Sequence, residues 1–176
     1  MTYRFPRARA ALLVPLVITL GALPAGCSRH EVAQHDGSQH DTHAAGGAAI
    51  AQLALDAGRK WQTDGPLRVG LGAIHAAFEA EHAAIDDGSA SDAQYDALAD
   101  RIEAQVQDIV RNCKLPPAAD ANLHFIVADL MRGVHEMRGG DPARTRHDGA
   151  ALVHGALGAY PAFFDDPGFA AAAQLP

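Results

Sequence analysis

The chain has little cysteine, with only Cys27 and Cys113 among its 176 residues. Two cysteines can form one disulfide at most, so a disulfide framework cannot organise the fold. The sequence also lacks a Cys-x-x-Cys-His motif, which excludes covalently attached c-type haem. The protein must therefore rely on a packed apolar core.

Positive charge is also scarce. The chain has 14 basic and 21 acidic side chains, and three of the basic residues lie in the first 26 positions, which contain no acid. Removing that segment leaves 11 basic side chains and a net charge near −10. This charge cannot neutralise a phosphate backbone, so we predict that nucleic acid is not a partner.

Residues 1–26 have the layout of an export signal. Three arginines precede the apolar run AALLVPLVITL at residues 10–20, and small residues then lead to Cys27. The apolar run is too short, and too interrupted by proline and glycine, to span a bilayer. We therefore predict a cleaved signal peptide and export to the bacterial periplasm.

Residues 23–27, LPAGC, resemble a bacterial lipobox, although the leucine lies four residues before Cys27 rather than three. This resemblance implies that Cys27 carries lipid and becomes the mature N-terminus. Ser28 at the next position implies the outer membrane, so the predicted partner is a membrane bound through the lipid anchor. The alternative is simple cleavage to a soluble periplasmic protein. The sequence identifies no protein partner.

Residues 27–47 are predicted to be a disordered tether, because they contain almost no apolar side chain that could offset the entropy of ordering. Four of the ten histidines lie here, at positions 30, 35, 40 and 43. They are either part of a solvated linker or transient metal ligands.

From residue 48 to residue 176 the apolar periodicity predicts helices. A short helix is expected over 48–61, with Leu53, Leu55 and Trp61 on its apolar side. Four long helices follow, and their predicted core stripes are Leu67, Leu71, Ile74 and Phe78; Tyr95, Leu98, Ile102, Val106, Ile109 and Cys113; Leu123, Ile126, Leu130, Val134 and Met137; and Val153, Leu157, Tyr160 and Phe164.

Several local signals mark the ends of these four helices. Asp64-Gly-Pro66 and a capping box over residues 91–94 are expected to open the first two. Leu115-Pro116-Pro117 should end the second, so that the third begins at residue 119 or 120. Gly139-Gly140 should end the third, and Asp141-Pro142 should begin the fourth.

Four long amphipathic helices with short loops predict an all-α domain, an up-down-up-down antiparallel four-helix bundle preceded by the short N-terminal helix. No segment alternates with period two over enough residues to predict a strand.

Residues 64–164 resemble soluble cytochrome b562, through the stretch LRVGLGAI and the stretch LHFIVADLMRGVHEMRGGDPARTRHDGAALVHGALGAY. The resemblance implies an exported four-helix bundle. In that family a methionine of the first helix and a histidine after an Ala-Tyr pair bind a non-covalent haem. Leu71 and Pro161 stand at these positions, and neither can ligate iron. Haem could then be bound only by other residues, such as His154 with His75 or Met131.

A second resemblance rests on K-W-x-T-D-x-P-L-R at residues 60–68 and N-C-x-L-x-P-x-A-D-A-x-L-H at residues 112–124. These stretches are similar to an uncharacterised family of exported bacterial proteins. The resemblance implies a domain over this region and no particular reaction.

Candidate metal ligands lie on the third predicted helix, where His124, Met131 and His135 are spaced 7 and 4 residues apart. His75 and His154 could join them from neighbouring helices. Imidazole and thioether groups favour copper or another late transition metal. Di-iron chemistry would need Glu-x-x-His on two helices, which the sequence does not contain. The alternative is that these histidines are boundary residues with their rings against the core.

Cys113 is expected to be a small buried hydrophobe with a raised pKa, or else a ligand or redox thiol. The acid pairs 86–87 and 165–166 are expected to be solvated. No nucleophile–base pair, phosphate loop or paired-carboxylate site is recognisable, so we predict that the protein is not an enzyme. The predicted function is an exported cell-envelope binding or accessory protein that takes a late transition metal; the alternative is a b-type haem electron carrier with non-standard ligands.

Overall fold

The computed structural model describes residues 47–172, so the predicted signal peptide, the lipid site at Cys27 and nearly all of the predicted tether lie outside the described residues. Most of the described chain is helical, which confirms the all-α prediction. The helices are η1 (Ile50–Gln52), α1 (Gly65–Asp86), α2 (Asp92–Asn112), α3 (Pro117–Met137), α4 (Arg146–Phe163) and α5 (Pro167–Ala172). Two strands of two residues each, β1 (Trp61–Gln62) and β2 (Phe164–Asp165), complete the structure.

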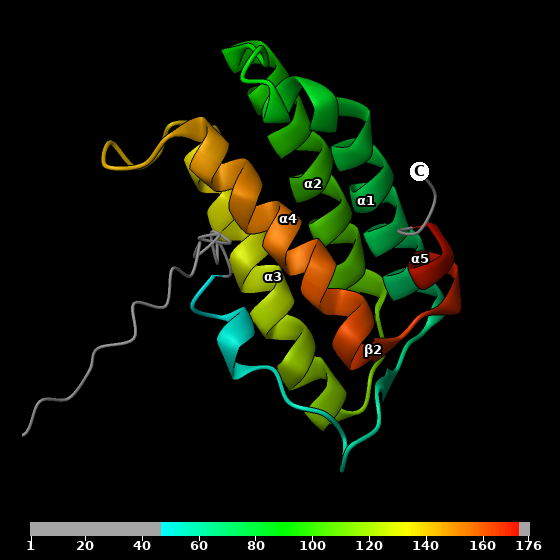
Figure 1. Cartoon of the computed structure of the whole chain (residues 1–176). Helices are drawn as coiled ribbons and strands as arrows, with labels where there is room; N and C mark the ends of the chain where they lie inside the picture. The colour runs from blue at the N-terminus through cyan, green and yellow to red at the C-terminus, as the bar shows by residue number, and fades with distance from the viewer. Residues whose placement is uncertain (1–46, 173–176) are drawn as a thin grey trace, which may run out of the picture. The chain divides into compact units, whose positions relative to one another are not determined.

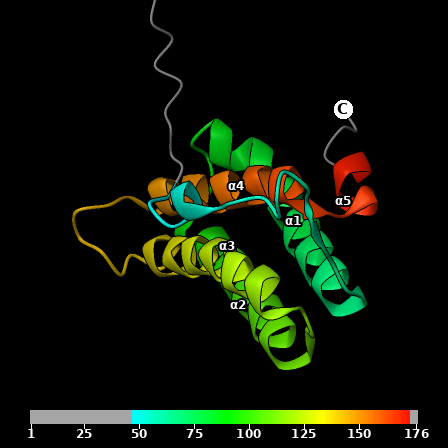
Figure 2. The ribbon, with the colours of Figure 1, turned by 90° about the horizontal axis from the view of Figure 1, so that it is seen from below.

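The four long helices enclose one apolar core. Contacts join α1 to α2, α2 to α3, α3 to α4 and α4 to α1 (Figures 1 and 2). Every residue of the four predicted core stripes is buried except Cys113, which is partly exposed. The helical periodicity therefore identified the core correctly.

The predicted starts of α1 and α2 are confirmed. Asp64 accepts a hydrogen bond from the Leu67 amide at 2.9 Å, with proline in the first turn of α1. Ser91 and Gln94 form the predicted capping box of α2. In each case a side-chain oxygen satisfies an amide that has no partner within the helix.

The predicted starts of α3 and α4 were wrong. Proline at 117 belongs to the first turn of α3, where its missing N–H has no cost. Helix α4 begins at Arg146, because Thr145 and Asp148 form a second capping box, Thr-x-x-Asp. Residues 141–144 form turns instead of the first turn of a helix.

The predicted helix over residues 48–61 was also wrong. Only η1 is helical there, and a tight turn joins Asp56 to Arg59 through reciprocal backbone hydrogen bonds of 2.8 and 2.9 Å. Ala57 and Gly58 have φ angles of 47° and 84° in that turn, which a right-handed helix does not allow. The segment instead runs along α3, where the buried carboxylate of Asp129 accepts the amide of Ile50 at 2.9 Å.

The two short strands connect distant parts of the sequence. Trp61 pairs with Phe164 and Gln62 pairs with Asp165 in a parallel arrangement. The hydroxyl of Thr63 donates to the Asp165 carbonyl at 2.7 Å. This pairing fixes the chain after α4 beside the start of α1, and α5 then lies against α1 (Figure 1).

Glycines bring α3 and α4 unusually close together. A Cβ atom on Gly149 would lie 2.6 Å from the Met137 amide nitrogen and 2.7 Å from the Gly133 carbonyl oxygen. A Cβ atom on Gly133 would likewise lie 2.7 Å from the Gly149 carbonyl oxygen. The two backbones therefore touch at this crossing, which only glycine permits.

Candidate functional site

One side of α1 carries alternating imidazoles and carboxylates. His75, Glu79, His82 and Asp86 follow each other at spacings of 4, 3 and 4 residues, which places them on one face of the helix. Glu79 lies between two histidines, with one carboxylate oxygen 3.7 Å from His75 Nε2 and the other 3.8 Å from His82 Nδ1. Asp86 lies 3.5 Å from His82 Nε2.

Helix α4 adds a further imidazole to this face. The ring of His154 is stacked on Phe78, with centroids 5.5 Å apart and planes 20° apart, and its centroid lies 5.4 Å from that of His82. His154 also lines a cavity of about 270 Å³ together with His75 and Glu79. Three potential ligand side chains from two helices therefore surround one small space, which we call the α1–α4 cavity.

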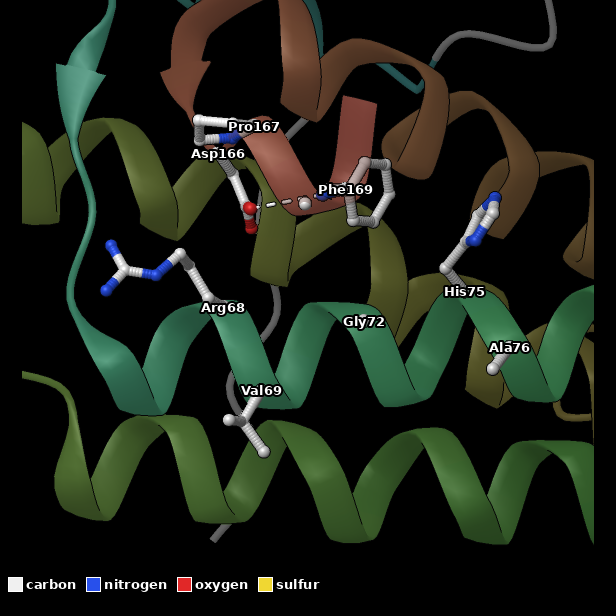
Figure 3. Close-up of a pocket in the computed structure, with 9 residues that line it drawn as sticks. Arg68, Val69, Gly72, His75, Ala76, Asp166, Pro167 and Phe169 are labelled. Carbon is white, nitrogen blue, oxygen red and sulfur yellow. Dashed lines mark hydrogen bonds between the residues drawn. The ribbon is translucent and has the colours of Figure 1, made fainter. Parts of the chain in front are cut away.

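A second cavity, of about 480 Å³, lies between α1 and the segment that leads into α5 (Figure 3). We call it the α1–α5 cavity, and its lining residues are Arg68, Val69, Gly72, His75, Ala76, Asp166, Pro167, Gly168 and Phe169. His75 and Phe169 line both cavities, and their ring centroids are 4.9 Å apart. This ring pair forms a shared wall.

Buried contacts hold the shared wall in place. Phe169 is 4% exposed and meets the Tyr160 ring edge-on at 4.9 Å. The carboxylate of Asp166 accepts the Phe169 amide and the Tyr160 hydroxyl, both at 3.1 Å. Burial, followed by the Asp166 charge, raises the pKa of Tyr160, so its hydroxyl stays protonated and continues to donate.

Each cavity is also bordered by a glycine inside a helix. A Cβ atom on Gly72 of α1 or on Gly158 of α4 would meet no heavy atom within 4 Å. Glycine inside a helix costs roughly 1 kcal/mol relative to alanine. Close packing does not require glycine at either position, and the effect of each is to keep its cavity wide.

A third cavity, of about 200 Å³, lies between the end of α2 and the start of α3 and includes Cys113, Asp120 and His124. The thiol of Cys113 donates to Asp64 at 3.5 Å. Burial, the Asp64 charge and that hydrogen bond raise the pKa of Cys113 to about 11. A thiol held protonated in this way is a weak nucleophile. The raised pKa agrees with the prediction, but the side chain is partly exposed where a buried one was expected.

The predicted ligands of the third helix are not brought together. His124 and His135 are eleven residues apart on α3, about 16 Å along the axis at 1.5 Å per residue, so one ion cannot bind both. The His124 ring contacts the Asp120 carbonyl at 2.8 Å, and the His135 ring lies against Gly140. Met131 is partly buried against the core. Of the five predicted metal ligands, the structure brings His75 and His154 to one cavity.

The sequence reasoning missed Glu79, Asp166 and Phe169. Glu79 and His82 form a single Glu-x-x-His pattern, a signal that could have drawn attention to α1. Asp166 was expected to be solvated, but it is 5% exposed and caps α5. The Asp-Pro dipeptide at 166–167 is a helix-start signal and could have predicted this role.

Within residues 47–172, no three His, Cys, Asp or Glu side chains are arranged closely enough to hold a metal ion as they stand. In the same part of the chain, no helix has both the length and the apolar character that crossing a bilayer requires. Comparison of the chain with protein-family models, with curated proteins and with solved structures gives no significant match. The two resemblances described from the sequence therefore stay predictions.

Proposed function

We propose that this chain is an exported cell-envelope protein whose helical domain binds a late transition metal ion in the α1–α4 cavity. The observation that carries the proposal is that His75, Glu79 and His154 line one cavity. Two neutral imidazoles and one carboxylate are a donor set that zinc and copper accept.

The proposed site would close around the ion by side-chain rotation. Glu79 is 49% exposed at its side chain and His154 is exposed, so neither is locked by packing on all sides. Glu79 would exchange its present position between His75 and His82 for a bond to the metal. His82, at 3.8 Å from the second Glu79 oxygen, would then orient that carboxylate.

The size of the α1–α4 cavity favours an ion over a larger cofactor. Its 270 Å³ is below the roughly 300–1,000 Å³ that is usual for small-molecule sites. A b-type haem protein is the second candidate, because the cavity contains His75 and His154, the pair available to replace the missing axial ligands. Titration with haem separates the two candidates, since only the second predicts a sharp Soret band.

The wider proposal places the domain in the cell envelope. The four long helices would form an antiparallel up-down-up-down bundle, attached to the outer membrane through lipid on Cys27. Palmitate labelling of the expressed protein should be lost in Cys27→Ala. Equal labelling of both proteins would leave only a cleaved, soluble periplasmic protein.

Calorimetric titration of the full-length protein with Cu²⁺ or Zn²⁺ tests the metal site. We expect His154→Ala and Glu79→Gln each to weaken binding at least tenfold, with His124→Ala as the matched control that leaves it unchanged. Binding should weaken as the pH is lowered, because imidazole binds metal only in its neutral form. If replacing the four histidines at positions 30, 35, 40 and 43 abolishes binding while His154→Ala does not, the proposal is wrong.

A further inference from the structure

The α1–α5 cavity has the size and lining of a small-molecule site, in contrast to the α1–α4 cavity. Its 480 Å³ lies inside the roughly 300–1,000 Å³ that ligand sites occupy. Its lining is mostly apolar and includes valine and alanine of α1 and proline and phenylalanine at the start of α5. An apolar ligand could therefore pack one of its faces against these walls.

The shape of the α1–α5 cavity favours a flat ring. Gly72 of α1 and Gly168 at the start of α5 both line the cavity, and neither projects a side chain into it. The aromatic rings of His75 and Phe169 close one end. Aromatic rings prefer to meet others edge-to-face or offset, which a planar ligand between these walls can achieve.

Arg68 supplies hydrogen-bond donors and a positive charge that could bind a polar group of the ligand. Its Nη1 donates to the carbonyl and the hydroxyl of Thr63, at 2.9 and 3.1 Å, and this pair of bonds holds the guanidinium in place. The hydrogen bonds recorded among the described residues leave Nε and Nη2 of Arg68 available. A guanidinium with free donors is suited to a carboxylate.

The other charged group of the lining does not compete for this role. Asp166 is 5% exposed, and its two oxygens already accept the Tyr160 hydroxyl and the Phe169 amide. Its buried charge limits the anion that can bind beside it, which favours a single negative charge over a dianion such as phosphate.

From these observations we infer that the α1–α5 cavity binds a small aromatic monocarboxylate, with the carboxylate on Arg68 and the ring between Gly72 and Gly168. This inference rests on different recognition groups from the proposed metal site, because Glu79 and His154 do not line this cavity and His75 is the one proposed metal ligand that lines both.

The test uses the full-length protein and two matched probes, indole-3-acetate and its uncharged analogue indole-3-acetamide. Amide chemical shifts in a ¹⁵N-labelled sample report both binding and its location. We expect saturable shifts at Gly72, His75 and Gly168 with the acid, and at least tenfold weaker binding of the amide. Arg68→Gln should weaken binding of the acid at least tenfold. Arg59→Gln, which removes an exposed arginine outside the cavity, should leave that binding unchanged.

Two filling variants distinguish the two cavities. Gly72→Leu should abolish binding of the acid and leave metal binding intact, because a side chain there meets open space and fills the α1–α5 cavity. Gly158→Leu should weaken metal binding and leave binding of the acid unchanged. Equal binding of acid and amide, no loss in Arg68→Gln or Gly72→Leu, or no saturable shift up to the solubility limit would each overturn the inference, whatever the outcome for the metal.

Discussion

Helix α4 meets its two neighbours in opposite ways. Against α3 it uses Gly149 opposite Gly133, and the two backbones touch. Beside α1 it presents Gly158 to the α1–α4 cavity, where a Cβ atom would meet no heavy atom within 4 Å. Gly72 of α1 faces open space in the same way, but in the α1–α5 cavity. The same residue type therefore brings helices together at the α3–α4 contact and keeps the two cavities beside α1 wide. The first pair serves stability, and we propose that the second serves binding.

The largest expected effect comes from breaking the α3–α4 contact. Gly149→Ala would place a methyl group 2.6 Å from a backbone nitrogen and 2.7 Å from a backbone oxygen, neither of which can move without separating the helices. We expect a loss of about 3 kcal/mol in the free energy of unfolding, at the upper end for overpacked cores. Urea denaturation measures it, and Gly133→Ala should behave similarly. Unchanged stability in both variants would show that the contact is not tight in solution.

A smaller loss is expected where α3 holds the N-terminal segment. Asp129 is 1% exposed and accepts hydrogen bonds from the Ile50 amide and from Arg132, each at 2.9 Å. Asp129→Ala leaves both donors without that acceptor, which should cost about 2 kcal/mol. Hydrogen exchange of the Ile50 amide should accelerate strongly, and Asp129→Asn, which keeps an acceptor oxygen, should show a weaker effect. Unaltered exchange in Asp129→Ala would contradict this role.

The same comparison shows how far the sequence could predict the structure. Helical periodicity depends on spacing along one helix, so it identified the buried stripes and the four long helices. The distance between two helices depends on what faces each residue across the interface, which the sequence does not display. Gly72 and Gly149 therefore look alike in the sequence, although one faces a cavity and the other a backbone.

The candidate site was predictable only in part for a related reason. His75 and His154 were identified as potential ligands by residue type, but their shared cavity depends on α1 and α4 lying side by side. The set on α3 was preferred because three potential ligands of two types, imidazole and thioether, occur close together in sequence. Helix rise separates its outer members by about 16 Å. The contacts between α1 and α4 instead bring His75 and His154 to one cavity.

The two glycines that border cavities, Gly158 of α4 and Gly72 of α1, should respond in the opposite direction to the glycines of the α3–α4 contact. Gly158→Ala and Gly72→Ala add a methyl group where no atom lies within 4 Å and improve helix propensity. We expect each to raise the free energy of unfolding by about 0.5–1 kcal/mol, measured by the same urea titration. A loss of stability in either variant would mean that its glycine has a packing partner, and the contrast with the α3–α4 contact would disappear at that position.

The smallest effect is expected where the end of α2 meets the start of α1 and the partly exposed thiol of Cys113 donates to Asp64. Burial and the charge of Asp64 raise the pKa of Cys113 from an ordinary 9.0 to about 11. Between these values the unfolded thiol loses its proton while the folded thiol keeps it. The folded state therefore binds more protons than the unfolded state, and the free energy of unfolding must fall as the pH rises from about 9 to about 11.

A serine at this position does not ionise in that range, so Cys113→Ser should flatten this part of the pH dependence. The free energy of unfolding of the native protein should fall relative to that of Cys113→Ser by less than about 1 kcal/mol between pH 9 and pH 11. The effect is small because the thiol is partly exposed and solvent screens its charge. Tyr95 and Tyr160 also have raised pKa values, but both proteins contain them, so their contributions cancel in the comparison. Asp64→Asn removes the second cause of the shift and should bring the thiol pKa closer to 9, measured by thiolate absorbance in a Cys27→Ala background. Parallel stability curves together with a thiol that titrates near 9 in the folded protein would show that Asp64 and Cys113 do not interact.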